Sequence, residues 1–144
     1  MALSSLHALG FRTAREKMAE ILREDGTNPD YSVASLEGLE RILARFRRPA
    51  DEPPALSPDE LHGLQVRAGA YAAEVLLRVV PGADVSLKDG EMVLNLPSEA
   101  YPGLRLEAYP RLRVGKVLRG EEALLDWAVF FLALTVKAPA GPEP

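Results

Sequence analysis

A cluster of basic side chains in the last third of the chain is the arrangement with the most evident chemistry. Its members fall within fifteen residues and are Arg105, Arg111, Arg113, Lys116 and Arg119. Such a cluster could bind phosphate, nucleic acid or an acidic protein by charge attraction. We favour a second interpretation, in which the cations line a solvated strand and helix edge and discourage sheet aggregation. The net charge of −4 also argues against general nucleic-acid binding, because phosphate contacts require a surplus of Lys and Arg.

A second candidate pair, Tyr71 and Glu74, stands one helical turn apart among alanines. The carboxylate of Glu74 is either solvated or held in a buried hydrogen bond. We favour solvation, because glutamate is almost never fully buried unless it is paired. A cleft around this pair is the one enzymatic alternative that the sequence leaves open, and we assign no catalytic residue.

Residues for metal and cofactor chemistry are missing from the sequence. Cysteine is absent, which excludes disulfides, thiolate metal sites and a cysteine nucleophile. The two histidines, His7 and His62, have no carboxylate or second histidine at a ligand spacing. The sequence also contains no glycine-rich phosphate loop and no nucleophile-elbow serine. We therefore expect no metal and no cofactor, and we interpret the chain as a non-enzymatic domain.

The last expected helix is apolar on nearly every side. Glu121 and Glu122 are expected to begin it, since negative charge suits a helix N-terminus. Its apolar residues then run without interruption through 127–134, which is too short to span a bilayer. Such a helix is either buried on several sides or covered by another protomer. We therefore predict a homodimer or a protein partner, with interface anchors at Trp127, Phe130, Phe131 and Leu134.

A long central helix over 57–80 is expected to position these groups. Ser57 is its predicted N-cap, with proline at the first helical position and Glu60 completing a capping box. Apolar residues recur at spacings of three or four and mark one face as core. Small residues at 68–70 and 72–73 predict that another element approaches this helix closely.

Two helices are expected before it, over 11–24 and 32–48. Gly10 leaves open whether the leucines of 3–9 extend the first helix, because glycine costs about 1 kcal/mol relative to alanine. Either Ser32 or Ser35 caps the second helix. The proline-rich stretch 49–58 is a linker to the central helix.

Beyond the central helix the apolar period changes from 3.6 to 2, which predicts strands. Asp89–Gly90 is a strong hairpin signal, and Lys88 and Glu91 flank it as a possible cross-strand ion pair. A third strand is expected over 104–108 and a short helix could open at Pro110. We expect an α+β fold: three N-terminal helices, a three-stranded antiparallel meander and a C-terminal hydrophobic helix packed on the sheet.

One domain is expected over 1–137, followed by a disordered tail over 138–144. No secretory signal or membrane span is evident, so a cytoplasmic location is the default. The few lysines and many Ala and Pro residues are typical of GC-rich bacteria, thermophiles among them.

Three segments resemble a group of small bacterial α+β domains of unknown function. They read DYSVASLEGLERIL, GAYAAEVLLR and RLRVGKVLRGEEALLDW, and the resemblance spans 30–127. That group commonly has glycine before the glutamate of the second motif, whereas Ala73 precedes Glu74 here. The resemblance implies a compact domain and carries no reaction with it.

Overall fold

Five helices and a three-stranded antiparallel sheet make up the structure, a computed structural model that describes residues 5–49, 51–98, 101 and 103–135. The helices are α1 (Ser5–Glu24), α2 (Leu36–Arg45), α3 (Pro58–Val79), α4 (Pro110–Leu118) and α5 (Leu124–Thr135). The strands are β1 (Asp84–Lys88), β2 (Glu91–Pro97) and β3 (Arg105–Ala108). The expected α+β class is confirmed. The expected disordered tail at 138–144 lies outside the described residues.

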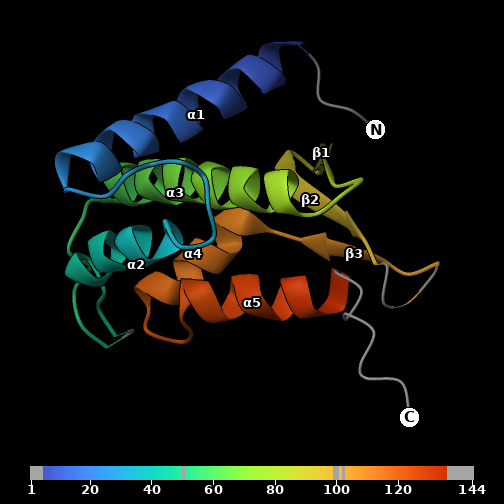
Figure 1. Ribbon diagram of the computed structural model, residues 1–144. Helices are drawn as coiled ribbons and strands as arrows, with labels where there is room; N and C mark the ends of the chain where they lie inside the picture. Colours follow the sequence, from blue (N-terminus) through green and yellow to red (C-terminus); the bar gives the residue numbers. More distant parts are fainter. Residues whose placement is uncertain (1–4, 50, 99–100, 102, 136–144) are drawn as a thin grey trace.

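The central position of α3 is evident in Figure 1, where it lies between α1 and the lower helices. The predicted capping box is confirmed at its N-terminus. The Glu60 amide donates to the Ser57 hydroxyl at 3.2 Å, and the Ser57 amide donates to the Glu60 carboxylate at 3.1 Å. These bonds pair two of the amides that a helix start leaves without partners.

The small residues of α3 allow α4 to approach its backbone. A Cβ atom added at Gly69 would lie 2.9 Å from the Arg111 backbone nitrogen and 3.1 Å from the Pro110 carbonyl carbon. Real Cβ atoms essentially never come that close to backbone. The expected close approach is therefore confirmed, and glycine is required at this crossing.

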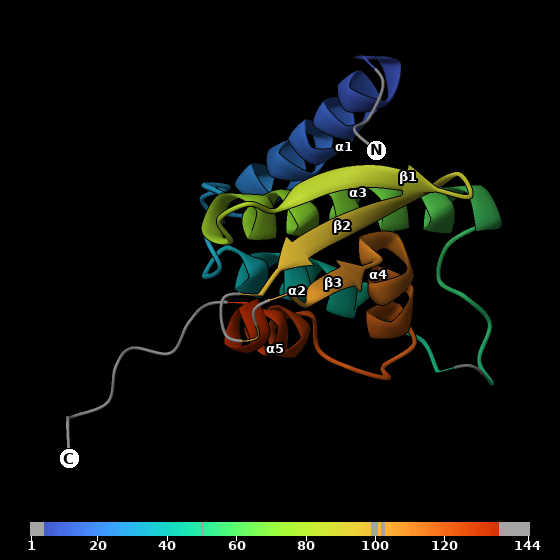
Figure 2. The ribbon, with the colours of Figure 1, turned by 90° about the vertical axis from the view of Figure 1, so that its right-hand side faces the viewer.

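The sheet follows the chain in the order β1-β2-β3 (Figure 2). Asp89 and Gly90 form its first turn with positive φ angles of 52° and 78°, as the hairpin signal predicts. Lys88 faces Glu91 in the strand register, but the predicted ion pair between them is wrong. The Lys88 ammonium instead contacts Glu107 of β3 at 3.3 Å, because Glu91 is held by Arg111.

The start of α5 differs from the prediction. The helix begins at Leu124, and Glu122 turns away to bind Arg113. A carboxylate from α2 takes the capping role, since Glu40 accepts the amides of Leu124 and Leu125 at 3.1 and 3.2 Å. The negative charge at this helix N-terminus thus comes from a distant part of the chain.

The structure decides how far α1 extends and which serine precedes α2 as a cap. α1 is continuous through Gly10, so the residues from Ser5 belong to the first helix. Ser35 precedes α2 without capping it through its side chain. The hydroxyl of Ser32 instead accepts the Ser35 amide at 3.1 Å, which stabilises the turn before the helix.

One apolar core joins all five helices and the sheet. Its largest fully buried side chains are Tyr71, Met18, Leu22, Leu36, Leu39, Leu43, Leu76, Leu94, Leu96, Leu124, Val75 and Val80. No helix in the described part of the chain is long and apolar enough to cross a membrane.

Candidate functional site

The four predicted anchors on α5 divide between its two faces. Trp127 and Phe131, one turn apart, are 4% and 7% exposed and face the core. Phe130 is 57% exposed, with its ring edge-on to Phe131 at a centroid distance of 5.5 Å. Leu134 is half-buried near the end of the helix. Of the four predicted anchors, only Phe130 is therefore exposed.

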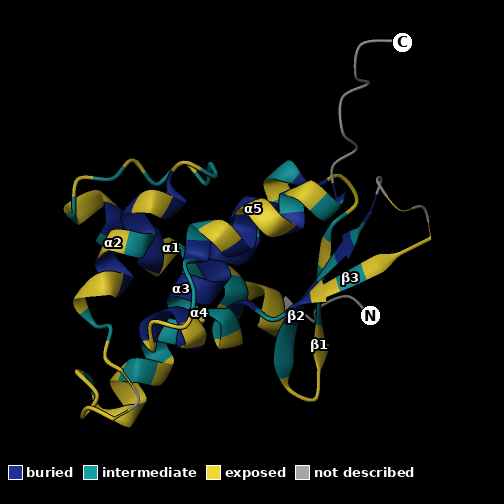
Figure 3. Ribbon diagram, turned by 90° about the horizontal axis from the view of Figure 1, so that it is seen from below, coloured by how far each residue is buried: buried dark blue, intermediate teal, exposed yellow. Residues whose placement is uncertain are grey.

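The exposed residues of α5, coloured yellow in Figure 3, lie on one side of the helix at spacings of three or four and are Asp126, Val129, Phe130 and Ala133. We define the α5 surface as Val129, Phe130 and Ala133, all exposed and within four residues of one another. Val129 is 54% exposed. Asp126 is the only charged residue of α5, and it lies on the same side of the helix as this surface.

An exposed tyrosine lies beside the C-terminal end of α5. The Ser98 hydroxyl donates a hydrogen bond to the Leu134 carbonyl and accepts the Tyr101 amide at 3.0 Å. Tyr101 is 56% exposed, and nearby Leu104 is 44% exposed. Two further large side chains are thus exposed before β3.

The predicted basic cluster is largely neutralised by carboxylates. Arg111 binds Glu91 through two nitrogens, and Arg113 reaches both oxygens of Glu122 at 2.8 and 2.9 Å. The remaining pairs are Arg119–Glu121 at 3.2 Å and the exposed, 3.8 Å pair Arg105–Asp84. Among the described residues, Lys116 is the only member of the cluster without an ion pair. The cluster therefore does not form a basic patch, because Lys116 is its one cation whose charge is not balanced by a neighbouring carboxylate among the described residues.

Glu74 is held between two arginines from different parts of the chain. Its oxygens accept from Arg15 of α1 and from Arg78 one turn later, both at 2.8 Å. The Glu74 side chain is only 12% exposed, so the favoured solvated interpretation is wrong. Pairing removes the objection to burial, because each carboxylate oxygen has a cationic donor.

Tyr71 is fully buried in a hydrogen-bond chain. The Ser35 hydroxyl uses its one hydrogen on the Ser32 carbonyl at 2.6 Å. The Tyr71 hydroxyl therefore donates to Ser35 at 2.7 Å, and it accepts the Tyr31 amide at 3.2 Å. Burial raises the pKa of Tyr71 above its usual value of 10.0, against the opposing effect of the Ser35 hydrogen bond.

The Tyr31 ring covers Tyr71 on its solvent side. Tyr31 has a φ of 58°, a left-handed conformation that is unusual for a bulky residue. Its ring stacks on Tyr71 at 4.7 Å, and the Arg78 guanidinium lies over the ring at 4.2 Å. Burial raises the pKa of Tyr31 as well. Tyr71 thus fixes the loop before α2, whereas Glu74 pairs α3 with α1 through Arg15.

The same loop is held by Asp30. Its carboxylate accepts the Ser32 hydroxyl at 2.6 Å and the Ser32 amide at 3.0 Å. These hydrogen bonds, the hydroxyl first, hold the pKa of Asp30 below its usual value. The Asp-Tyr-Ser segment therefore has a structural role that its short sequence did not reveal.

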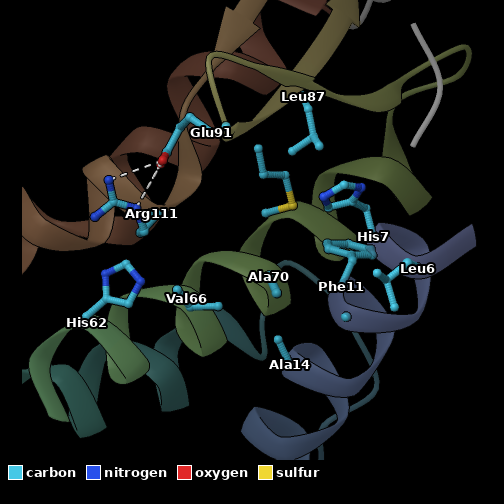
Figure 4. Close-up of a pocket in the computed structure, with 13 residues that line it drawn as sticks. Leu6, His7, Phe11, Ala14, His62, Val66, Ala70, Leu87, Glu91 and Arg111 are labelled. Carbon is cyan, nitrogen blue, oxygen red and sulfur yellow. Dashed lines mark hydrogen bonds and ion pairs between the residues drawn. The ribbon is translucent and has the colours of Figure 1, made fainter. Parts of the chain in front are cut away.

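A pocket of about 350 Å³ lies between α1, α3 and the β1–β2 hairpin (Figure 4). The fold brings both histidines to it, His7 from α1 and His62 from α3. The Arg111–Glu91 ion pair lies at the same end as His62. The sequence did not predict this pocket, because its residues come from four separate segments. Their one shared property is that most of them are apolar, which does not distinguish them from core residues.

Metal binding finds no support in the described residues, where no group of three or more His, Asp or Glu side chains could hold an ion. Comparisons with protein-family models, with curated proteins and with solved structures find no match to this chain.

Proposed function

We propose that this protein is a non-enzymatic interaction domain that associates with a second copy of itself through the α5 surface. The observation that carries the proposal is the exposure of Phe130 and Val129 on a helix whose opposite face is already buried. Aromatic anchors of this kind dominate the energetics of protein interfaces.

A second copy fits this surface better than a charged partner. The surface is apolar, and α5 holds one charged residue, Asp126. Two such helices related by a twofold axis would bury the apolar side chains of Val129 and Phe130 against each other. Stable dimers bury about 1,200–2,000 Å² in total, so we expect Tyr101 and Leu104 to join the contact.

Sedimentation velocity of the full chain tests the proposal. We expect the wild type to shift from monomer to dimer as its concentration rises to about 100 µM, the weak range for a small apolar interface. Phe130→Glu should remain folded and monomeric, because the introduced carboxylate is solvated in the monomer but desolvated in the dimer.

Leu9→Glu is the matched control. Leu9 is 49% exposed on α1, which lies on the opposite side of α3 from α5 in Figure 1. This variant should dimerise like the wild type. A wild type that stays monomeric at the highest concentration contradicts the proposal, as does equal disruption by both variants.

Three finer expectations accompany this proposal. Packing of α5 on the sheet is supported by the hydrogen bond from Ser98, which follows β2, to Leu134. The resemblance of 30–127 to the group of bacterial domains stays a prediction that rests on its sequence motifs. Anion binding through 105–119 receives less support, because most of its cations already bind carboxylates.

A further inference from the structure

We propose that the pocket between α1, α3 and the β1–β2 hairpin binds a small amphiphile, namely an apolar chain with a single carboxylate at one end. This ligand site is separate from the α5 surface and does not depend on dimer formation. Size, lining and hydrogen-bond donors each support it.

The size of the pocket suits a small molecule. Its volume of about 350 Å³ lies within the range of about 300–1,000 Å³ that is usual for small-molecule sites. An extended hydrocarbon chain belongs to this size class.

The lining of the pocket is apolar on three sides. Phe11 of α1, Val66 of α3, and Leu87 and Met92 of the hairpin form its walls (Figure 4). Val66 and Leu87 are 36% and 37% exposed, so an apolar ligand would remove hydrophobic side chains from water. This burial supplies the favourable free energy of binding.

The hydrogen-bond donors at the His62 end of the pocket select the ligand head group. Among the described residues of the lining, Glu91 is the only carboxylate, and Arg111 neutralises it. Arg111 carries five N–H donors, of which three bind Glu91 and Gln65. Two donors remain, and the exposed His62 ring lies at the same end of the pocket. These donors are complementary to a carboxylate head group, which accepts N–H hydrogen bonds.

Small residues keep the pocket open. Gly10 lies in its wall, and a Cβ atom added there would meet no atom within 4 Å. A larger side chain at this position would therefore occupy the ligand space without a backbone clash. Gly10→Leu is for that reason a blocking variant that should still fold, since leucine is also the better helix former.

Decanoate is the probe for the test. The ¹⁵N-labelled full chain is titrated below the micelle concentration of the probe, and amide chemical shifts and calorimetric heats are recorded. We expect saturable shifts at the residues of the pocket. Gly10→Leu should weaken binding by at least about tenfold. Ala8→Leu adds the same side chain to an exposed position of α1 outside the pocket and should bind like the wild type.

The head group is tested separately with decanol and decyltrimethylammonium. Decanoate should bind most tightly, and His62→Leu should weaken decanoate several-fold while leaving decanol unchanged. The absence of saturable binding overturns the proposal, as does equal loss of binding in Gly10→Leu and Ala8→Leu. Equal affinity for decanol overturns the carboxylate assignment. Shifts at the pocket with an amphipathic leucine–lysine peptide, but none with decanoate, would assign the pocket to a protein partner instead.

Discussion

At the scale of single residues, Gly69 determines how closely α4 can pack on the central helix. Gly69→Ala should destabilise the protein by about 1–3 kcal/mol, because the added methyl group would clash with the backbone at Pro110 and Arg111. The clash outweighs the gain of about 1 kcal/mol in helix propensity. Urea denaturation followed by circular dichroism measures the change.

Gly63→Ala, six residues earlier on the same helix, is the matched control for that variant. A Cβ atom there would meet only the end of the flexible Arg67 side chain, at 3.0 Å. This variant should be neutral or more stable by up to about 1 kcal/mol. If both alanine variants gain stability equally, the close contact with α4 does not limit position 69.

At the scale of secondary-structure elements, α5 depends on a cap that α2 provides. Glu40→Gln should destabilise the protein by about 1–2 kcal/mol, because it removes the charge at the α5 N-terminus and one of the two strong acceptors. Amide hydrogen exchange at Leu124 and Leu125 should accelerate more than exchange in the middle of α3.

The control for this variant is Glu37→Gln, an exposed position on the same helix. Its stability should stay within about 0.5 kcal/mol of the wild type, as is usual for surface substitutions. Unchanged exchange at both α5 amides in Glu40→Gln would contradict the capping role.

The two caps show what sequence alone could predict about these elements. Ser57 and Glu60 are three residues apart, so their capping box can be recognised from the local sequence. Glu40 lies 84 residues before Leu124, and nothing local marks that contact. A prediction from local sequence therefore begins α5 too early, at the nearest acidic residues, Glu121 and Glu122.

The same limit applies to the candidate sites. The spacing of Arg111 and Arg113 in the sequence suggested a basic cluster, but their carboxylate partners come from β2 and from the turn before α5. The residue types at 127–134 correctly predicted an apolar helix, since that property is local. Which of its aromatic rings face solvent depends on tertiary packing, and the structure leaves Phe130 as the exposed one.

At the scale of the whole molecule, the stacked pair Tyr31 and Tyr71 joins α3 to the loop before α2, and it makes stability sensitive to alkaline pH. Burial raises the pKa of both phenols above 10.0 in the folded protein. In the unfolded chain they ionise near 10. The folded state therefore binds more protons above pH 10, and the free energy of unfolding should fall as pH rises from there.

Tyr71→Phe should make the free energy of unfolding fall less steeply with pH, because it removes one phenol whose pKa differs between the folded and unfolded states. The same variant should lower stability at neutral pH. The neutral-pH loss is about 1–3 kcal/mol, since the part-buried Tyr31 amide loses its acceptor. Urea denaturation at several pH values between about 8 and 11, with phenolate absorbance recorded in parallel, measures both effects. Tyr101→Phe, at an exposed position, should keep the wild-type decline. A decline as steep in Tyr71→Phe as in Tyr101→Phe would show that the stacked pair does not cause it.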